Sequence, residues 1–222
     1  MAKTTKTARR TPLNRESVLR GAVALADETG IESLSMRRLG QELGVVPMAL
    51  YKHVASKEDL LDGMVDIVFG EIEDPSTATD WKGAMRRRAT SARAVLRRHR
   101  WAIGLMESRT NPGPANLRHH EAVMRCLREA GFPFELAVHA YSMQDSYIYG
   151  FALQEKTLPF ETPDEHAELV QEKAERVGDL DEYPYLVELA KNLVQARYDY
   201  AAEFEWGLDL VLEALERARS ER

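Results

Sequence analysis

Apolar residues recur every three or four positions along most of the chain, a pattern that predicts amphipathic helices. Ser35 can cap one such helix, and Met36, Leu39 and Leu43 then fall on a single apolar face. Gly44 follows at once and suits the left-handed residue that commonly ends a helix. The pattern therefore predicts a short helix that ends in a tight turn.

A second short helix is predicted directly after this turn. Pro47 suits its first turn, where a missing N–H costs little, and Leu50 and Val54 give it an apolar stripe. Ser56 can cap a further helix, with Asp59 three positions on as an imperfect capping box. Two helices joined by such a turn form a helix-turn-helix, whose second helix can lie in the DNA major groove. Three short amphipathic helices also fit the corner of an ordinary helical bundle.

The rest of the chain is also predicted to be helical. No segment alternates β-branched and polar residues with a period of two, so no sheet is expected. Gly, Pro and polar clusters interrupt the pattern, most clearly in the loop 74–80. The fold class is all-α, and the further helices are expected at 15–29, 57–73, 81–98, 101–108, 115–130, 134–157, 164–176, 184–197 and 200–219.

Composition narrows the class of protein. The chain has 222 residues, of which 30% are charged and 44% hydrophobic, as in soluble globular proteins. No apolar run approaches the roughly 20 residues of a membrane helix, and the polar, basic N-terminus lacks the apolar core of a secretory signal. Cys126 is the single cysteine, so no internal disulfide is possible, and it lies among apolar residues as a buried thiol would. A cytoplasmic location fits these features.

Charge is distributed unevenly along the chain. Residues 1–54 hold nine Lys and Arg against five Asp and Glu, whereas the remainder holds 21 against 31. A basic end on an acidic body is expected when only that end meets a polyanion such as DNA, although soluble chains also show charge fluctuations of this size. Residues 1–13 form a basic arm without an apolar pattern, and such an arm can touch phosphates or the minor groove.

The residues of the helix-turn-helix offer both kinds of contact that DNA recognition needs. Arginines can reach a guanine edge or a phosphate, and small apolar side chains at the start of the second helix can touch a thymine methyl group. Polar and cationic groups around the following turn and at the next helix N-terminus suit phosphates. A solvated helix face is the alternative for the charged residues, and packing is the alternative for the aromatic ones. The candidate DNA-binding residues are Arg37, Arg38, Pro47, Met48, Ala49, Tyr51, Lys52, His53, Ser56 and Lys57.

The C-terminal helices carry aromatic and Met side chains that suit a pocket for an apolar or amphipathic effector. Ordinary core packing is the alternative for each of them. Asp145 stands out because it lies on a fairly apolar helix and needs a partner if it is buried. The candidate ligand-binding residues are Met64, Trp81, Met85, Trp101, Met106, His120, Met124, Tyr141, Asp145 and Tyr149.

Two of the predicted helices, 134–157 and the last one, are more apolar than one-sided packing requires. Pairing them between two subunits would give a four-helix interface, whereas burial within one chain is the alternative. The candidate dimer-interface residues are Ala137, Ala140, Gln144, Tyr147, Phe151, Phe204, Trp206 and Leu210.

Catalysis and metal binding find little support in the sequence. His119 and His120 are adjacent, so on a helix their side chains point about 100° apart. They are therefore poorly placed to bind one metal ion together. There is no HExxH motif, nucleophile–base motif or phosphate loop, so we expect no metal, no cofactor and no catalytic residue. An enzyme using Asp145, His120 or His139 remains an alternative, as does a constitutive DNA-binding protein with a solidly packed C-terminal domain.

The residues Val18–Leu61 resemble the DNA-binding domain of the tetracycline-repressor (TetR) family. The likeness rests on ALADETGIESLSMRRLGQELGV and on PMALYKHVASKEDLL, in which Leu50, Tyr51, His53 and Val54 form the most specific part. The C-terminal segments WAIGLMESRTNPGPANLRHHE, YSMQDSYIYGFALQE and FEWGLDLVLEAL resemble that family's ligand domain.

The resemblance implies an all-helical homodimer that binds a palindromic operator and is released by a small-molecule effector, most often as a transcriptional repressor. After the flexible basic arm at 1–13, it implies a three-helix DNA-binding domain at 14–56 and a larger helical effector-binding and dimerisation domain at 57–222. Family DNA contacts correspond to Arg37, Pro47, Met48, Ala49, Tyr51, Lys52, His53 and Lys57. The magnesium–drug ligands of the tetracycline repressors are not assigned to residues of this chain.

Overall fold

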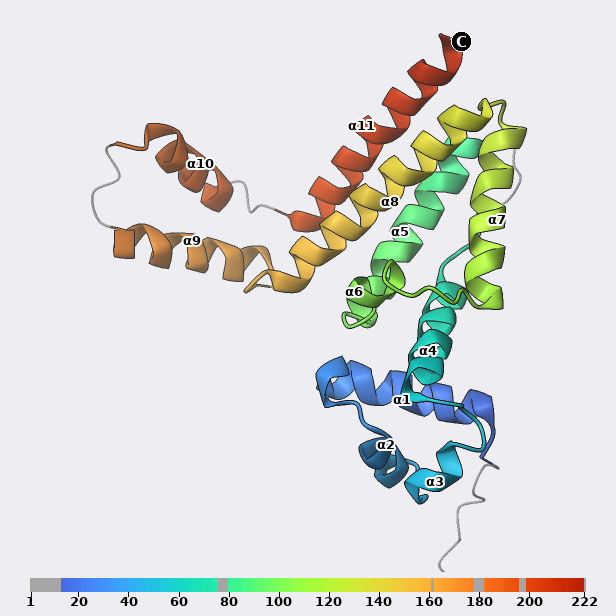
Figure 1. Cartoon of the computed structure of the whole chain (residues 1–222). Coiled ribbons are helices and arrows are strands. Elements are labelled where there is room, and N and C mark those ends of the chain that lie inside the picture. The colour runs from blue at the N-terminus through green and yellow to red at the C-terminus, as the bar shows by residue number, and fades with distance from the viewer. Residues whose placement is uncertain (1–12, 76–79, 161, 178–181, 196–198, 222) are drawn as a thin grey trace, which may run out of the picture. The chain divides into compact units, whose positions relative to one another are not determined.

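The computed structural model describes residues 13–75, 80–160, 162–177, 182–195 and 199–221, and within these ranges all regular elements are helices (Figure 1). The all-α class is therefore confirmed. No helix in this part of the chain is long and apolar enough to cross a membrane. The elements are α1 (Arg15–Thr29), the 3₁₀ turn η1 (Ile31–Ser33), α2 (Met36–Glu42), α3 (Pro47–Leu50), α4 (Lys57–Glu71), α5 (Trp81–Arg98), α6 (Ile103–Met106), α7 (Pro114–Glu129), α8 (Phe134–Thr157), α9 (Pro163–Val177), α10 (Pro184–Gln195) and α11 (Tyr200–Ser220).

The helices pack into two units. The first contains the described residues up to Glu73 together with Arg98–Glu121, and the second contains those from Asp74 to Arg97 and from Ala122 onward. The segment 98–121 therefore packs with the N-terminal helices, although it is distant from them in sequence. This grouping by contact differs from the predicted division by function, in which the effector domain begins at residue 57.

Local sequence explains where the N-terminal helices begin. Asn14 caps α1 in a reciprocal capping box with Ser17, and Ser35 caps α2 by accepting a hydrogen bond from the Arg38 N–H. Ser56 caps α4 in the same way, accepting from the Asp59 N–H at 3.1 Å. The caps predicted at Ser35 and Ser56 are confirmed.

Helices α3 and α6 are shorter than the apolar pattern predicts. Helix α3 ends at Leu50. Val54, the next residue of the predicted apolar stripe, is buried although it lies beyond the helix, after the turn that follows it. The N–H groups of His53 and Val54 both donate to the Leu50 carbonyl and close that turn. Apolar spacing reports which side chains are buried, and a turn can bury them as well as a helix does.

The second unit has α5, α8 and α11 at its centre, and buried charges join α5 to α8. The Arg88 guanidinium donates to the Asp145 carboxylate, and Arg93 donates to Glu155 at 2.6 Å and 3.0 Å. The Arg93 guanidinium also lies 4.9 Å from the centre of the Phe204 ring of α11. Helices α9 and α10 pack against each other.

Candidate nucleic-acid interface and effector domain

The turn between α2 and α3 depends on a close approach of the backbone at Gly40. The Val45 N–H donates to the Gly40 carbonyl at 2.8 Å, and a Cβ atom at Gly40 would lie 2.8 Å from the Val45 carbonyl oxygen. Gly44 in the same turn has a φ of 65°, the left-handed conformation predicted for it. The two glycines allow α3 to fold back against α2 as a helix-turn-helix.

The packing of this motif leaves the candidate DNA-binding side chains outside. Leu39, Leu50 and Val54 are buried in the unit, whereas Met48 is 71% exposed and Tyr51 is 44% exposed. Large apolar side chains exposed on a short helix and on the turn after it indicate a contact surface. The other candidates are exposed or half-buried: Arg37, Arg38, Lys52, Ser56 and Lys57 are exposed, and Pro47, Ala49 and His53 are half-buried.

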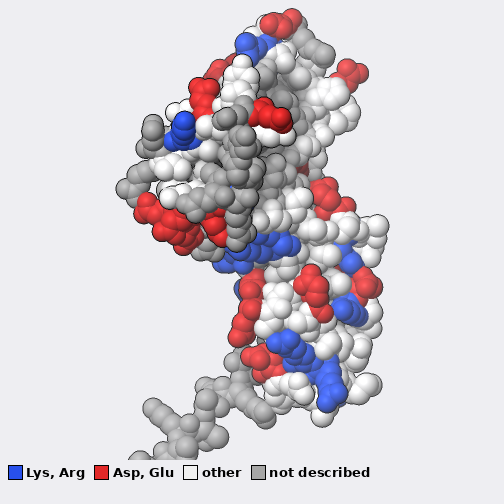
Figure 2. Space-filling model, turned by 90° about the vertical axis from the view of Figure 1, so that its left-hand side faces the viewer, with Lys and Arg blue, Asp and Glu red and all other residues white. Residues whose placement is uncertain are grey.

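The cations of this surface are available for phosphates. Among the residues that the structure describes, Arg37, Arg38, Lys52 and Lys57 form no ion pair within 4 Å, so their charges are not neutralised by the protein. Figure 2 shows a group of Lys and Arg side chains on the part of the first unit that α2 and α3 form in Figure 1. Tyr51, Lys52 and His53 lie in the turn after α3 rather than on the predicted helix.

A polar clamp fixes this turn to α1 and α4. Arg15 of α1 donates to the His53 carbonyl at 3.1 Å and to both carboxylate oxygens of Asp59, at 2.6 Å and 2.9 Å. Asp59 also accepts from the Ala55 N–H at 2.7 Å. Hydrogen bonding from Arg15 is the main cause that lowers the pKa of the Asp59 carboxyl. The clamp therefore holds the stretch of chain that carries the phosphate-contacting candidates.

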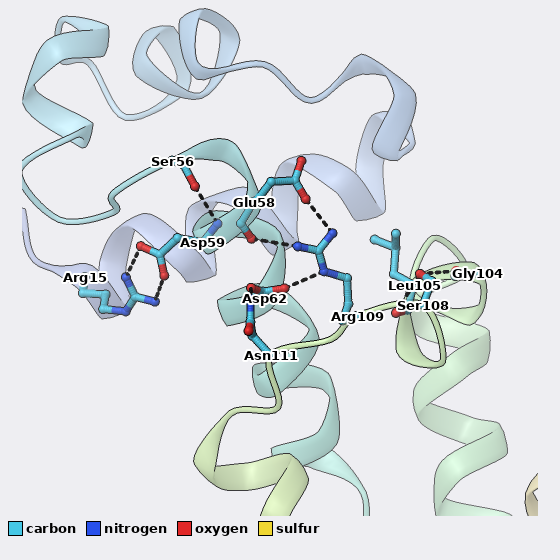
Figure 3. A network of polar contacts seen from close by, with 10 residues as sticks. All are labelled: Arg15, Ser56, Glu58, Asp59, Asp62, Gly104, Leu105, Ser108, Arg109 and Asn111. Atoms are coloured by element: carbon cyan, nitrogen blue, oxygen red, sulfur yellow. Dashed lines mark hydrogen bonds and ion pairs between the residues drawn. The ribbon is translucent and has the colours of Figure 1, made fainter.

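A second clamp joins α4 to the segment between α6 and α7 (Figure 3). Arg109 points at the first turns of α4, where it donates to the Glu58 carboxylate at 2.7 Å, to the Glu58 carbonyl at 3.2 Å and to the Asp62 carboxylate. Asn111 donates to the other Asp62 oxygen at 3.2 Å. Asp66, one turn further along α4, accepts from the N–H groups of Ala115 and Asn116 at the start of α7.

Buried polar contacts continue this connection at the other end of α4. The His99 ring lies between two carboxylates, 2.8 Å from Asp27 of α1 and 3.1 Å from Glu71 of α4. The Trp101 indole N–H donates to the same Asp27 oxygen at 2.7 Å. Burial alone raises the pKa of the Glu71 carboxyl, but contacts with His99 and Arg98 outweigh it and lower this pKa. The segment 98–121 therefore binds both α1 and α4.

A cleft of about 560 Å³ lies between α1, α4 and the start of α7 in the first unit. Its carboxylates, Glu58, Asp59, Asp62 and Asp66, are already engaged by Arg15, Arg109 and backbone N–H groups. None of the ligand-binding candidates lines this cleft.

The structure divides the ten ligand-binding candidates between the two units. The Trp101 N–H is engaged within the protein, as described above, and the Trp81 N–H donates to Glu216 at 2.9 Å, so in this structure both indole donors are already used. Met64, Trp101, Met106 and His120 belong to the first unit, and Trp81, Met85, Met124, Tyr141, Asp145 and Tyr149 belong to the second.

Asp145 is buried and has the partner that its position demanded. Its side chain is about nine-tenths buried and accepts from Arg88, which is itself 1% exposed. Arg88 was not predicted from the sequence, although the signal was present: it falls on the apolar face of α5 between Met85 and Ala89. A charged residue on such a face needs an opposite charge from another helix.

The dimer-interface candidates separate by burial. Ala137, Ala140, Gln144 and Phe204 have no exposed area in the single chain, as expected for the alternative of burial within one chain, and their place in a dimer interface stays a prediction. Tyr147 and Phe151 are half-buried, with the Tyr147 hydroxyl donating to the Phe204 carbonyl at 2.9 Å. Trp206 and Leu210 are exposed. Four further exposed apolar side chains of α8 were not among the candidates: Phe134, Val138, Met143 and Leu153.

Comparison with known protein families agrees with this architecture. Residues 18–64 match the model described as bacterial regulatory proteins of the tetR family, and residues 74–219 match the tetracyclin repressor-like C-terminal domain. The HTH-type transcriptional repressor DrrR1 of Streptomyces coeruleorubidus is 32% identical over 92% of this chain and 77% of its own. The tetracycline repressor protein class A from transposon 1721 of Escherichia coli is 30% identical, covering 94% and 93% of the two chains.

Solved structures show the same fold. Apo ActR from Streptomyces coelicolor matches with a TM-score of 0.77 at 27% identity, covering 95% of this chain and 98% of that one. ActR in complex with actinorhodin matches with a TM-score of 0.76 at 27% identity, covering 94% and 99%. The family models together span both the helix-turn-helix and the C-terminal helices. The chain therefore belongs to the tetR family of bacterial regulatory proteins.

Proposed function

We propose that this regulator is a homodimeric repressor that binds a palindromic operator through α2 and α3 and releases it when a small molecule binds the C-terminal domain. The exposed surface of Met48, Tyr51 and four unneutralised cations around a folded helix-turn-helix is the observation that carries the DNA-binding part. Family members are DNA-binding regulators, so regulation rather than catalysis is assigned. A DNA target implies a cytoplasmic protein.

The apolar side chains exposed on α8 and α11 support the homodimer. Trp206 is 64% exposed and Leu210 is 53% exposed, although both lie on a helix whose other face is buried. Two-fold pairing of α8 and α11 from each subunit would cover these side chains in a four-helix interface. Such a dimer presents two copies of α3 to two half-sites about one DNA turn apart.

A charge introduced at this face tests the dimer. Leu210→Glu should yield monomers in sedimentation velocity, because two carboxylates would then be buried against apolar surface. Leu117→Glu is the matched control: Leu117 is 57% exposed on α7 in the other unit, and its replacement should leave the dimer intact. Dimers of unchanged stability in Leu210→Glu would contradict this interface.

The proposed effector is a small, mainly apolar molecule. ActR, a structural relative, has been solved with actinorhodin, and the matched C-terminal domain of this chain buries many apolar and Met side chains. The segment 98–121 lies in the matched effector domain by sequence but packs on α1 and α4, so it offers a route from effector to operator. A ligand uses that route only if it binds the DNA-free conformation more tightly.

Selection from random duplex DNA tests the proposed function directly. We expect enrichment of one palindrome, and we expect a small, mainly apolar compound to weaken binding to it. A palindrome that no ligand of the protein releases would indicate constitutive DNA binding. Enrichment of no sequence, with binding that is only salt-sensitive, would refute the operator-specific regulator.

A further inference from the structure

Gln144 is a polar residue in the interior of α8. The residues one turn before and after it, Ala140 and Ile148, have no exposed area, so Gln144 lies on the buried stripe of the helix. Its own side chain is likewise fully buried. Neither its amide nitrogen nor its amide oxygen has a hydrogen-bond partner among the residues that the structure describes.

A buried amide without partners is costly, because it has exchanged hydrogen bonds with water for none in the protein. A second subunit packs on the outside of the chain and does not reach Gln144, which has no exposed area, so a partner must be small enough to enter the interior of the unit. A buried water would need further polar partners beyond Gln144 to be held there. A bound molecule that brings its own polar group into the second unit remains as the partner.

The surroundings restrict the chemistry of that molecule. The next residue, Asp145, is buried and already paired with Arg88, so the adjacent charges balance each other. A charged ligand group would therefore be buried without a counter-charge, whereas a neutral group would not. The amide of Gln144 offers both a donor and an acceptor, which a neutral amide or similar group matches with two hydrogen bonds.

We propose that Gln144 is the hydrogen-bonding contact for the effector, and that the effector is a neutral, mainly apolar molecule carrying a donor and an acceptor side by side. The assignment rests on the proposed function, because it supplies a recognition residue for the ligand of that repressor. It also explains why a residue that weakens the unliganded protein occupies the core of the effector domain.

Three naphthalene probes isolate this chemistry in calorimetric titrations of the full-length protein. 2-Naphthamide has donor and acceptor, 2-acetylnaphthalene has the same shape with a methyl group in place of the NH₂, and 2-naphthoate is charged. We expect 2-naphthamide to bind about tenfold more tightly than either other probe, since each of those leaves Gln144 poorly paired. Equal affinities for the three, or no saturable binding of 2-naphthamide, would overturn the proposal.

The variant Gln144→Met supplies the second measurement, because Met keeps the length and unbranched shape of Gln. The variant should lose the preference for 2-naphthamide, and in the absence of probe its unfolding constant in urea should fall about tenfold. A raised unfolding constant or failure to fold would show that the amide is satisfied within the protein and would overturn the proposal. Gln144→Glu, which keeps the size but adds charge, should fold less stably than wild type.

Operator binding, measured on the same samples, separates this proposal from the proposed function. We expect wild type and Gln144→Met to bind the selected palindrome equally. A compound that releases the operator equally from both would leave the repressor in place and move its effector site away from Gln144. Loss of specific operator binding by wild type would instead refute the proposed function.

Discussion

The turn of the helix-turn-helix permits a sharp test at Gly40. The substitution Gly40→Ala adds a Cβ atom that would lie 2.8 Å from the Val45 carbonyl oxygen and 3.4 Å from the Pro47 nitrogen. Both neighbours are backbone atoms, so neither can rotate away as a side chain would. Overpacking of this kind costs about 1–3 kcal/mol, which exceeds the roughly 0.5–1 kcal/mol that Ala gains over Gly within a helix. We expect a net loss of stability.

The matched control is Gly70→Ala in α4. Gly70 is exposed, and a Cβ atom there would meet only the Ala115 Cβ at 3.5 Å, an ordinary contact. This substitution should stabilise the protein by roughly 0.5–1 kcal/mol, because only the helix-propensity gain applies. The same chemical change is therefore expected to have opposite signs at the two sites.

Urea unfolding and operator binding measure the two consequences. Gly40→Ala should unfold at lower urea, and its folded form should bind the operator at least tenfold more weakly, because the shifted turn displaces α3. Gly70→Ala should bind as wild type does. A Gly40→Ala protein that is as stable as Gly70→Ala and binds DNA fully would refute the close approach of Gly40 and Val45.

Three further outcomes follow from the clamps and the cations. The Asp59 carboxyl has a lowered pKa in the folded protein, so its ionised form adds to the free energy of unfolding above its ordinary pKa, and this contribution is lost as the pH falls through the folded pKa. The Asp59→Asn protein should therefore be less stable than wild type at neutral pH. Its free energy of unfolding should also fall less steeply as the pH is lowered. Arg109→Ala should keep operator affinity within about threefold while weakening the effect of any releasing compound, measured as the ratio of operator affinities with and without it. Lys52→Ala should reduce the slope of log affinity against log salt by about 0.9 for each phosphate that the Lys52 ammonium neutralises.

Local signals in the sequence predict much of this fold. The bounds of α1 and α8 follow from apolar spacing and from stop signals such as Gly30 and Leu158-Pro159. The N-cap of α2 follows from Ser35, a residue type that commonly caps helices, directly before the apolar pattern begins. These features depend on neighbours within a few residues, which the sequence displays directly.

The partners of the buried charges could not be predicted, because they lie far apart in the chain. Arg109 meets Asp62 across 47 positions, and Arg88 meets Asp145 across 57. The apolar stripe of α8 gave no indication of which neighbour covers it, so Gln144 was assigned to the dimer face although it is buried within one chain. Periodicity identifies a buried face but not what buries it.

Operator affinity of single-residue variants tests the central claim most directly. Arg37→Ala and Tyr51→Ala should each bind the selected palindrome at least tenfold more weakly and lose preference over a scrambled duplex of equal length. Arg20→Ala is the control: Arg20 is exposed on α1 in the same unit and, among the described residues, forms an ion pair with Glu16 alone, so its loss should change affinity by less than about threefold. Equal losses in all three variants, or none, would contradict recognition of DNA by the surface of α2 and α3.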